Sequence, residues 1–519
     1  MKHIKLFLIF IISFSLFGCN KNNQYGQTNK NIYYENYLDD ERYDSSLFYK
    51  NHGDIIGADP SVITVGAEYY LYITNADGSD CSFIQAYKSK NLMDWEWLGR
   101  VFIPNRDAWA ISSLWAPEVV ESNGKYYMYY SGYDINYQCM GVGLAISDSP
   151  SGPFKEYSGT LEDGTVIDHS VSPFNYVLKE YSEDFKCIDP SLFKDDDGKV
   201  YLYLSQDQVK RTSSVYGMEL ESDMVSIKKE TITGPLVTAT QSWESKDATI
   251  KWNEAPHMIK HNNKYYLMYS ANYFSSSLYS IGYATSSSPL GKFTKPESNP
   301  ILQAKEDWPF ISGPGHCSVF PSSDGSELFM AYHSHLDVGD AGSIRKINFD
   351  RISFKNNELI VNGPSITPQL LPSGSSEYKN ITSLATVTCE NDCDTSLLID
   401  NVINTDYNLV DINEVKFDKK TNIKLTFEKE MNVKVILVYD SAEYKLSAES
   451  YKLKFSKDRV GNVYFNQNYK YIDEFEYEIK IPMAASIIQF DDEIKTNEVE
   501  FTFNKGVSIS EIIIVGGEC

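Results

Sequence analysis

Trp252-Asn253-Glu254-Ala255-Pro256-His257-Met258-Ile259, followed by Asn263-Lys264-Tyr265-Tyr266-Leu267-Met268-Tyr269-Ser270-Ala271, sets the pattern for most of this chain. The second run is aromatic, apolar and rich in β-favouring residues, and a polar turn at residues 261–263 opens it, so it predicts a strand of a sheet. The first run carries a lone carboxylate, Glu254, where another strand begins. Because the chain repeats this arrangement, the stretch predicts more than one hairpin.

Five units share the order of short strand, polar turn and aromatic strand. They pair residues 59–62 with 68–73, 115–119 with 124–130, 189–192 with 198–203, 254–258 with 263–271, and 316–319 with 327–332. A repeat of roughly 55 to 75 residues made of antiparallel strands predicts a β-propeller of about five blades. We expect this domain to occupy residues 46–372.

The repeat predicts where the first residues of these units meet. Equivalent positions in radially arranged blades lie at similar distances from the axis. If the first strand of each unit is innermost, Asp59, Asp189, Glu254 and His316 face one central funnel. Three carboxylates in a concave site are the groups that acid–base hydrolysis requires. Glu118 is a fourth carboxylate on the same face, for which we favour a structural role.

The last part of the chain has a different pattern. Residues 371–376 have the composition of a linker, and residues 422–427, 433–439 and 499–503 then alternate apolar and polar side chains. This predicts a β-sandwich of jelly-roll type over residues 380–519. Its first and last segments, residues 396–401 and 509–516, resemble galactose-binding-like domains, which leaves sugar binding and bracing of the propeller as alternatives. The predicted fold is all-β, a five-bladed β-propeller followed by a C-terminal β-sandwich.

The N-terminus predicts export and anchoring. A basic start and a short apolar core over residues 1–18 predict a signal peptide that is too short to span a membrane. The sequence Leu16-Phe17-Gly18-Cys19 resembles a bacterial lipoprotein cleavage box, so Cys19 would carry lipid and residues 19–45 would form a flexible tether. The alternative is a plain secretory signal with a chance cysteine. We expect a protein of the cell envelope, at the outer membrane or in the periplasm of a Gram-negative bacterium.

Charge and cysteine content exclude several other functions. The net charge of −24 argues against nucleic acid as a partner and against binding to anionic membrane surfaces. Seven of the eight cysteines follow Cys19, so at least one of them is free or pairs between chains. Their spacing matches no zinc site, and we interpret them as structural. Cys389 and Cys393 are near enough to close a small loop, although sequence does not fix the pairing.

Several short motifs together resemble glycoside hydrolase family 43 over residues 50–372. The motifs are Ala58-Asp59-Pro60-Ser61-Val62, Trp115-Ala116-Pro117-Glu118, Ile188-Asp189-Pro190-Ser191, Asn253-Glu254-Ala255-Pro256-His257 and Gly313-Pro314-Gly315-His316-Cys317-Ser318-Val319-Phe320. The resemblance implies a five-bladed propeller and an inverting enzyme that acts on arabinose, xylose or galactose linkages of plant polysaccharides.

The resemblance also implies catalytic roles. Asp59 matches the general base, Glu254 the general acid, and Asp189 the third carboxylate, which orients the acid and tunes its pKa. Inverting hydrolases hold base and acid roughly 6.5 to 9.5 Å apart, which leaves room for a water molecule. The alternative for each Asp-Pro pair alone is a turn. His316 matches an axial histidine beside a calcium ion or water cluster, and the alternative is a buried histidine that supports the pocket floor.

Aromatic side chains are expected to form the pocket walls. Trp115, Trp308 and Phe310 are the candidates, and Arg345 resembles an arginine of the last blade that reaches the pocket; each is either a substrate contact or a packing residue. We favour an α-L-arabinofuranosidase acting on an oligosaccharide or polysaccharide. A β-xylosidase or galactan-directed enzyme is the alternative within the family, and a non-catalytic glycan-binding lipoprotein is the alternative outside it.

Overall fold

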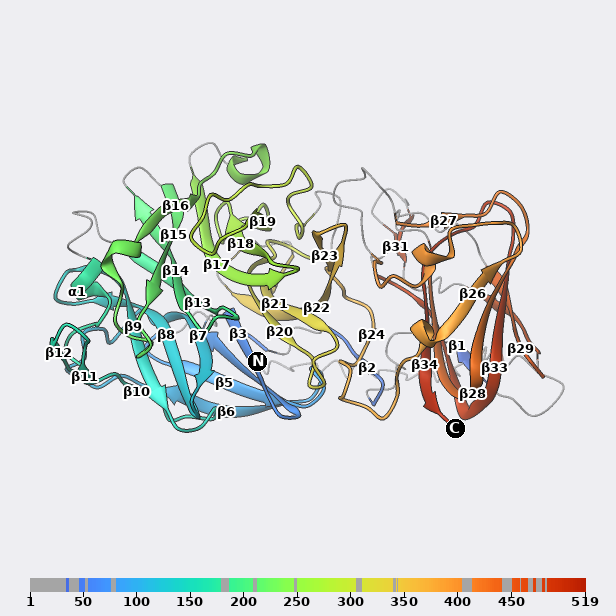
Figure 1. Ribbon diagram of the computed structural model, residues 1–519, viewed down its shortest axis with the longest axis horizontal. Helices are drawn as coiled ribbons and strands as arrows, with labels where there is room; N and C mark the ends of the chain where they lie inside the picture. Colours follow the sequence, from blue (N-terminus) through green and yellow to red (C-terminus); the bar gives the residue numbers. More distant parts are fainter. Residues whose placement is uncertain are drawn as a thin grey trace, which may run out of the picture.

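The computed structural model confirms the predicted all-β architecture. It describes residues 34–36, 46–51, 55–75, 81–178, 186–208, 212–246, 250–304, 310–338, 342, 344–403, 413–440, 450–457, 459–464, 470–472, 478–480 and 483–519. Figure 1 shows the propeller in blue to yellow and the C-terminal domain in orange and red beside it. The predicted signal peptide and Cys19 lie outside the described residues. No helix within these ranges has the length and apolar character needed to cross a membrane.

Five groups of antiparallel strands form the blades, and a short parallel pairing of Thr212 and Ser213 with Lys251 and Trp252 joins blades 3 and 4 into one seven-stranded sheet. Blade 1 contains β3 (Ala58–Val65), β4 (Glu68–Thr74), β5 (Ile84–Ser89) and β6 (Trp95–Phe102). Blade 2 contains β7 (Trp115–Ser122), β8 (Lys125–Asp134), β9 (Cys139–Ser147) and β10 (Lys155–Glu156). Blade 3 contains β13 (Cys187–Lys194), β14 (Val200–Gln208), β15 (Thr212–Leu220) and β16 (Thr233–Val237). Blade 4 contains β17 (Lys251–His261), β18 (Lys264–Ala271) and β19 (Ser280–Ser286), and blade 5 contains β20 (Gly315–Pro321), β21 (Leu328–His335), β22 (Arg345–Lys355) and β23 (Glu358–Asn362).

Short elements connect and supplement the blades. The strands β11 (Gly159–Thr160) and β12 (Val166–Ile167) and the helix α1 (Asn175–Leu178) lie between blades 2 and 3 in the chain. The 3-10 helices are η2 (Lys229–Thr231), η3 (Ser242–Ser245), η4 (Thr382–Leu384) and η5 (Thr395–Leu398). Outside the blades, β2 (Phe48–Tyr49) pairs with β24 (Gln369–Leu370), so the beginning and the end of the propeller region are joined.

A bulge marks the first strand of every blade. At each bulge the pairing with the second strand slips, and one residue has a positive φ. These residues are Asp59 (51°), Ala116 (47°), Asp189 (55°), Ala255 (54°) and His316 (50°). The shared bulge supports the repeat, but it corrects one assignment. Ala255, not Glu254, occupies the position of Asp59 and Asp189, because the sequence pattern does not show at which residue the extra position is inserted.

A ring of hydrogen bonds joins each blade to the next through these bulge residues. In every case a side chain near the end of one blade's second strand accepts the backbone N–H of the bulge residue of the following blade. The bonds run from Ala116 N to Thr74 Oγ1 (2.8 Å), Asp189 N to Ser131 Oγ (2.9 Å), Ala255 N to Ser205 Oγ (3.1 Å), His316 N to Ser270 Oγ (2.8 Å) and Asp59 N to His333 Nδ1 (3.1 Å). The last bond closes the ring between blade 5 and blade 1.

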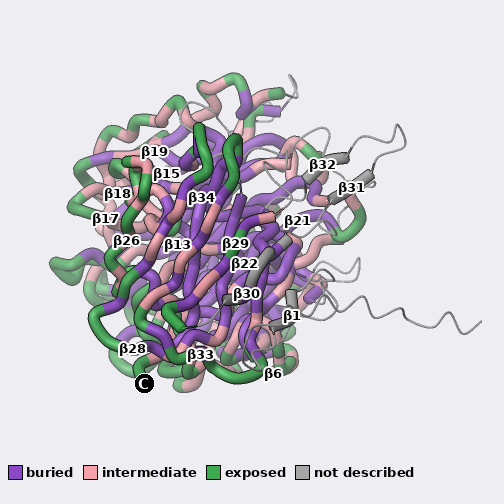
Figure 2. Tube along the Cα trace, turned by 90° about the vertical axis from the view of Figure 1, so that its right-hand side faces the viewer, coloured by how far each residue is buried: buried purple, intermediate pink, exposed green. Residues whose placement is uncertain are grey.

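The aromatic second strands form the core between the blades. Tyr72, Tyr130, Tyr203, Tyr269 and Tyr332 are all fully buried. Each lies in a hydrophobic cluster, and most of these clusters combine residues of neighbouring blades. Figure 2 shows buried residues filling the middle of the molecule and exposed residues gathering at its edges. The high tyrosine content of the sequence therefore reflects the packing of blades against one another.

The C-terminal domain is a sheet folded over its own core. The strands of this sheet are β25 (Lys379–Asn380), β26 (Ala385–Cys389), β27 (Val415–Lys416), β28 (Thr421–Asp440), β29 (Ser450–Phe455), β30 (Arg459–Tyr464), β33 (Ser486–Phe503) and β34 (Ser508–Glu518). The strands β31 (Lys470–Ile472) and β32 (Glu478–Lys480) form a separate two-stranded sheet. The long strand β28 pairs with β33 along both halves, with irregularities between Thr426 and Met431 and between Val433 and Val435. These breaks let the two halves close over one apolar cluster, as the alternating sequence predicts.

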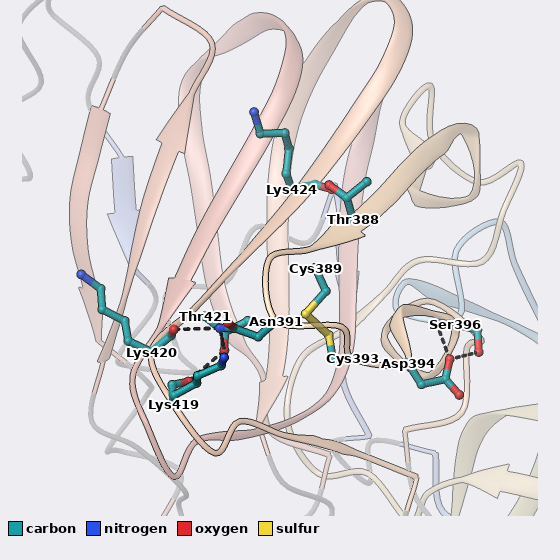
Figure 3. Close-up of a disulfide and its surroundings, with 10 residues drawn as sticks. All are labelled: Thr388, Cys389, Asn391, Cys393, Asp394, Ser396, Lys419, Lys420, Thr421 and Lys424. Atoms are coloured by element: carbon teal, nitrogen blue, oxygen red, sulfur yellow. Dashed lines mark hydrogen bonds between the residues drawn. A yellow bond between two sulfur atoms is a disulfide. The ribbon is translucent and has the colours of Figure 1, made fainter.

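Two details go beyond the sequence prediction. In the segment expected to be a flexible tether, β1 (Tyr34–Asn36) pairs with β33. In addition, Cys389 at the end of β26 forms a disulfide with Cys393 (Figure 3). Among the described cysteines, Cys317 and Cys519 are free thiols.

The C-terminal domain is joined to the propeller through a shared core. Leu47 and Phe48 of the β2 segment pack with Val435, Leu437 and Tyr439 of β28 in one buried cluster. Polar contacts accompany it: Tyr439 donates to Gln369 Oε1 (3.3 Å) and Ile403 N donates to Asn362 Oδ1 (3.0 Å). The domain therefore braces the propeller, which was one of the two roles expected for it.

Candidate active site

Asp59 lies at the centre of a polar cluster on the propeller axis. Its Oδ1 accepts a hydrogen bond from Arg345 Nη1 (3.2 Å) and lies 3.3 Å from His316 Nδ1, while Oδ2 accepts one from Thr74 Oγ1 (2.8 Å). The side chain is buried, which disfavours its charge. The neighbouring His316 and Arg345 outweigh that effect and hold the pKa of Asp59 well below its usual range. Asp59 is therefore ionised at neutral pH, the state that a general base requires.

Asp189 faces the strand that carries Glu254. Its Oδ2 accepts a hydrogen bond from Ala255 N (3.1 Å), so the Asp189 carboxyl lies against the peptide that follows Glu254. Burial raises the pKa of Asp189 to about 6, and the charge of Asp59 acts in the same direction. Asp189 thus fixes the backbone beside Glu254 and brings a second titrating carboxyl near it.

Glu254 is held by a tyrosine that the sequence prediction did not include. Tyr279 donates a hydrogen bond from its hydroxyl to Glu254 Oε1 (2.9 Å). Burial, together with the charges of Glu254, Asp189 and Asp59, keeps the pKa of Tyr279 well above its usual value, so the hydroxyl stays a donor. Tyr279 binds Glu254 and stacks on His333, which accepts the Asp59 N–H, and Asp189 accepts the N–H that follows Glu254, so these contacts bring Asp59, Asp189 and Glu254 into one site.

The ring of Tyr279 also reaches the general-base side of the site. It stacks on His333 with ring centroids 5.8 Å apart and planes inclined by 10°. Gly315 makes this packing possible, because a Cβ there would come within 2.0 Å of the tyrosine ring. Burial lowers the pKa of His333 to about 3, so its imidazole is neutral and Nδ1 is free to accept the Asp59 N–H. The Tyr279–His333 stack therefore connects the supports of Asp59 and Glu254.

His316 contacts Asp59, but its surroundings do not form a metal cage. Among the residues that the structure describes, no three His, Cys, Asp or Glu side chains are arranged to hold a metal ion. Calcium prefers six to eight oxygen ligands, whereas His316 offers a nitrogen that lies next to Asp59. The protein side chains around His316 do not fit direct calcium coordination, and we assign no chemical step to a metal.

Glu118 belongs to a second polar layer beside the first ring. Its Oε1 lies 3.7 Å from His257 Nδ1. Val119 N donates to Ser61 Oγ (3.1 Å) and Val319 N donates to His257 Nε2 (3.0 Å), so this layer again ties neighbouring blades together. Burial raises the pKa of Glu118 to about 8 and lowers that of His257 to about 4, which makes both neutral near pH 7. These contacts support the structural role expected for Glu118.

The predicted wall residues have different surroundings. Trp115 begins β7, partly exposed and one residue before the bulge at Ala116. Arg345 reaches Asp59 and lies over the ring of Phe274, with 5.0 Å from guanidinium carbon to ring centroid. Phe310 packs against the cluster between blades 4 and 5, so packing is its main role. Trp308 lies outside the described residues.

A second aromatic group was missed by the sequence prediction. Trp252, two residues before Glu254, packs edge-on against Tyr273 at a centroid distance of 5.5 Å. The Trp252 Nε1–H is buried, and the described residues provide no acceptor for it. Trp252 was not among the predicted wall residues, although alternation along the strand places it on the same side as Glu254.

Comparison with known proteins agrees with this geometry. The family model for glycosyl hydrolases family 43 matches residues 54–360. A β-D-galactofuranosidase of Aspergillus niger is 29% identical over 311 residues, covering 57% of this chain and 79% of its own length. A β-xylosidase of Xylanibacter ruminicola is 28% identical over 271 residues, covering 46% and 76% respectively.

Solved structures show the same relationship. The crystal structure of a thermostable family-43 glycoside hydrolase is 36% identical, with a TM-score of 0.55, and covers 63% of this chain and 99% of its own. The family match spans the five blades and every described residue of the carboxylate cluster. The chain belongs to glycoside hydrolase family 43, a family of inverting glycosidases.

Proposed function

We propose that the protein releases α-L-arabinofuranosyl units from plant-type polysaccharide, with Asp59 as general base and Glu254 as general acid. The observation that carries this assignment is the contrast between the two carboxyls. Arg345 and His316 hold Asp59 ionised, whereas Glu254 accepts a hydrogen bond from the Tyr279 hydroxyl, which stabilises the carboxylate that remains once Glu254 has given its proton away.

The proposed reaction is a single displacement. Asp59 removes a proton from a water molecule as the water oxygen attacks the anomeric carbon. The glycosidic bond breaks on the opposite face, and Glu254 gives its proton to the departing oxygen. The anomeric configuration inverts, and proton exchange with solvent restores both carboxyls. Asp189 holds the Glu254–Ala255 peptide throughout and is a positioning residue.

The proposed sugar specificity draws on the activities described for the relatives. The Aspergillus relative is described as a β-D-galactofuranosidase, and galactofuranose shares its five-membered ring with arabinofuranose. The Xylanibacter relative is described as a β-xylosidase, which keeps xylose as the alternative substrate. The short motifs do not separate these activities, because the loops around the mouth set the pocket shape.

The envelope location and lipid anchor at Cys19 are part of the proposal. The Cys389–Cys393 disulfide supports export, since disulfides persist mainly in oxidising compartments. A calcium ion at the axis would have to contact His316 through water molecules. A lower melting temperature of the protein in the presence of a chelator would indicate such an ion.

The decisive experiment measures hydrolysis of 4-nitrophenyl α-L-arabinofuranoside, β-D-xylopyranoside and β-D-galactofuranoside. We expect the arabinofuranoside to be cleaved fastest, and the first product seen by proton NMR to have the inverted configuration. Asp59→Asn should lower kcat on these substrates by about 10²- to 10⁴-fold, and Glu254→Gln should lower kcat by a similar factor on an arabino-oligosaccharide, whose leaving group needs protonation. Glu358→Gln, a change of an exposed carboxylate on β23, is the matched control. Full activity in Glu254→Gln would refute the assigned mechanism.

A further inference from the structure

A groove of about 620 Å³ lies at the boundary between the propeller and the C-terminal domain, next to their shared core. Blade 5 supplies one wall through Glu327 and the segment Arg351–Phe354, and the C-terminal domain supplies the other through η4 and Asp400–Ile403. Strand β22 begins with Arg345 at the active site and runs away from it. At about 3.3 Å per residue, the groove lies on the order of 25 Å from Asp59 along this strand. It is a separate site, of the volume typical for ligands and at a domain boundary where ligand sites are common.

Arg351 gives the groove unoccupied hydrogen-bond donors. Its Nε and Nη2 donate to Glu327 (3.0 and 3.3 Å), and Nη2 also donates to Leu371 O (2.9 Å). The guanidinium plane rests on Phe329, with 4.7 Å from its carbon to the ring centroid. These contacts fix the side chain, while the two N–H groups of Nη1 have no acceptor among the described residues. Because these donors are already rigid and oriented, the Arg351 side chain loses little conformational entropy when a ligand binds to them.

The rest of the lining combines polar groups with apolar surface. On the wall formed by the C-terminal domain, Asn380 Nδ2 donates a hydrogen bond to Asn401 Oδ1 (3.3 Å), and Ser373 and Ser376 also line the groove. The Oγ of Ser375, between these two serines, is buried without a partner in the described part of the chain. Leu384 on η4 is 53% exposed, which is unusual for a leucine beside a domain interface.

The charges of the lining nearly cancel. Arg351 and Lys379 are opposed by Asp324, Glu327 and Asp400, and the Arg351–Glu327 pair neutralises itself. Such a groove has no excess of cations to hold a phosphate and no convergent carboxylates to hold a metal. A neutral ligand rich in hydroxyl groups, with apolar ring faces, matches both the free donors and the apolar floor.

We propose that this groove is a non-catalytic binding site for a neutral polysaccharide segment of the class that the active site cuts. The inference rests on the proposed function for its choice of glycan. Because the groove and the carboxylates are far apart, a short substrate occupies only one of them, whereas a polymer can contact both. Binding at the groove raises the effective concentration of chain at the active site. The groove should therefore affect hydrolysis of polymer and leave hydrolysis of small aryl glycosides unchanged.

The test uses the Glu254→Gln protein, which binds substrate without cutting it, and calorimetry with α-1,5-arabino- and β-1,4-xylo-oligosaccharides. We expect two binding events per chain. A bulky polyethylene-glycol maleimide attached at Lys379→Cys, which is on the groove rim, should remove one of them. The same label at Lys416→Cys, an exposed lysine on β27 outside the groove, should leave both. The exposed Cys519 reacts equally in all of these proteins.

A second variant tests the donors without a label. The double change Arg351→Gln and Glu327→Gln removes both charges and keeps the shape, and we expect about tenfold weaker groove binding and a similar rise in KM for polymer. A single binding event in Glu254→Gln, unchanged by the label, would overturn the groove proposal even if the enzyme is active. Two events in a protein that cleaves no glycoside would instead overturn the proposed function and leave the groove standing.

Discussion

Removal of one oxygen atom, the hydroxyl oxygen of Tyr279, tests the assignment of Glu254 as general acid. Tyr279→Phe removes the hydroxyl that donates to Glu254 and keeps the ring that stacks on His333. A hydrogen bond to a charged group contributes about 1.5–3 kcal/mol, so we expect kcat to fall by about 10- to 100-fold. The loss should be larger for alkyl glycosides than for 4-nitrophenyl glycosides, because a good leaving group needs little help from the acid.

Comparing the two leaving groups separates this effect from simple unfolding. A destabilised protein would lose activity equally on both substrates. Arg345→Met provides the contrast within the site, since Arg345 supports Asp59 and the base is needed whatever the leaving group is. Equal losses on both substrates in Tyr279→Phe would show that Tyr279 does not act through Glu254.

Glu118 predicts a pH-dependent stability. Its folded pKa of about 8 lies above the unfolded value of 4.5, so the folded chain holds this proton more tightly. The contribution of Glu118 to the free energy of unfolding is therefore largest below pH 4.5, and it decreases as the pH rises towards 8. Glu118→Gln mimics the protonated form, and we expect it to be neutral near pH 5 and to stabilise the protein by roughly 2 kcal/mol near pH 8. Denaturant unfolding at the two pH values measures this, and a constant difference between them would contradict it.

The ring of hydrogen bonds between the blades predicts the effect of a substitution in the second strand of a blade. Ser270→Ala removes the acceptor of the His316 N–H and leaves that donor unpaired next to the site. We expect a loss of about 1–3 kcal/mol in unfolding free energy and a lower kcat. Blade 1 has a threonine, Thr74, at the equivalent position, so Ser270→Thr is the matched control and should be nearly neutral. Equal damage in both variants would mean that the ring does not depend on this hydroxyl.

At the level of the strands, the sequence predicts the five blades better than it predicts the position of the bulge within each first strand. Five aromatic strands at regular intervals reveal the propeller, because blade packing demands them in every repeat. The bulge residues share no residue type, since the five positions hold Asp, Ala, Asp, Ala and His, and the signal common to four of them is the proline that follows (Pro60, Pro117, Pro190 and Pro256), which the comparison of carboxylates overlooked. Glu254 was therefore grouped with Asp59 although it lies one residue earlier.

The residues that were missed lack a local signal. His333 and Tyr279 sit in apolar, aromatic strands or turns, where the sequence pattern favours a core role. The role of His333 depends on the ring closing between blade 5 and blade 1, a contact between residues 274 positions apart, and the role of Tyr279 depends on a hydrogen bond to Glu254, 25 positions earlier. Strand β1 was missed for a related reason, because its partner β33 lies far along the chain. Asp59 and Asp189 share a repeated Asp-Pro motif that marks their places in the sequence, and Glu254 lies one residue before the matching position of blade 4.

At the scale of the whole molecule, the shared core predicts coupled unfolding of the two domains. Phe48 is fully buried among residues of the C-terminal domain although it precedes the first blade. Phe48→Ala should cost about 3–5 kcal/mol. Because the lost contacts join the domains, we expect calorimetry to resolve two transitions where the unchanged protein shows one. Phe193→Ala, a partly buried change within the propeller, is the control and should lower a single transition.

The closing bond between blade 5 and blade 1 has a consequence for the timing of biosynthesis. Asp59 leaves the ribosome among the first residues, but His333, which holds its backbone, and Arg345, which holds its carboxylate, follow nearly three hundred residues later. Fragments that end before blade 5 therefore carry the base without its supports. A nascent or prematurely terminated chain is inactive, and hydrolysis begins only when the last blade has been made and joined to the first.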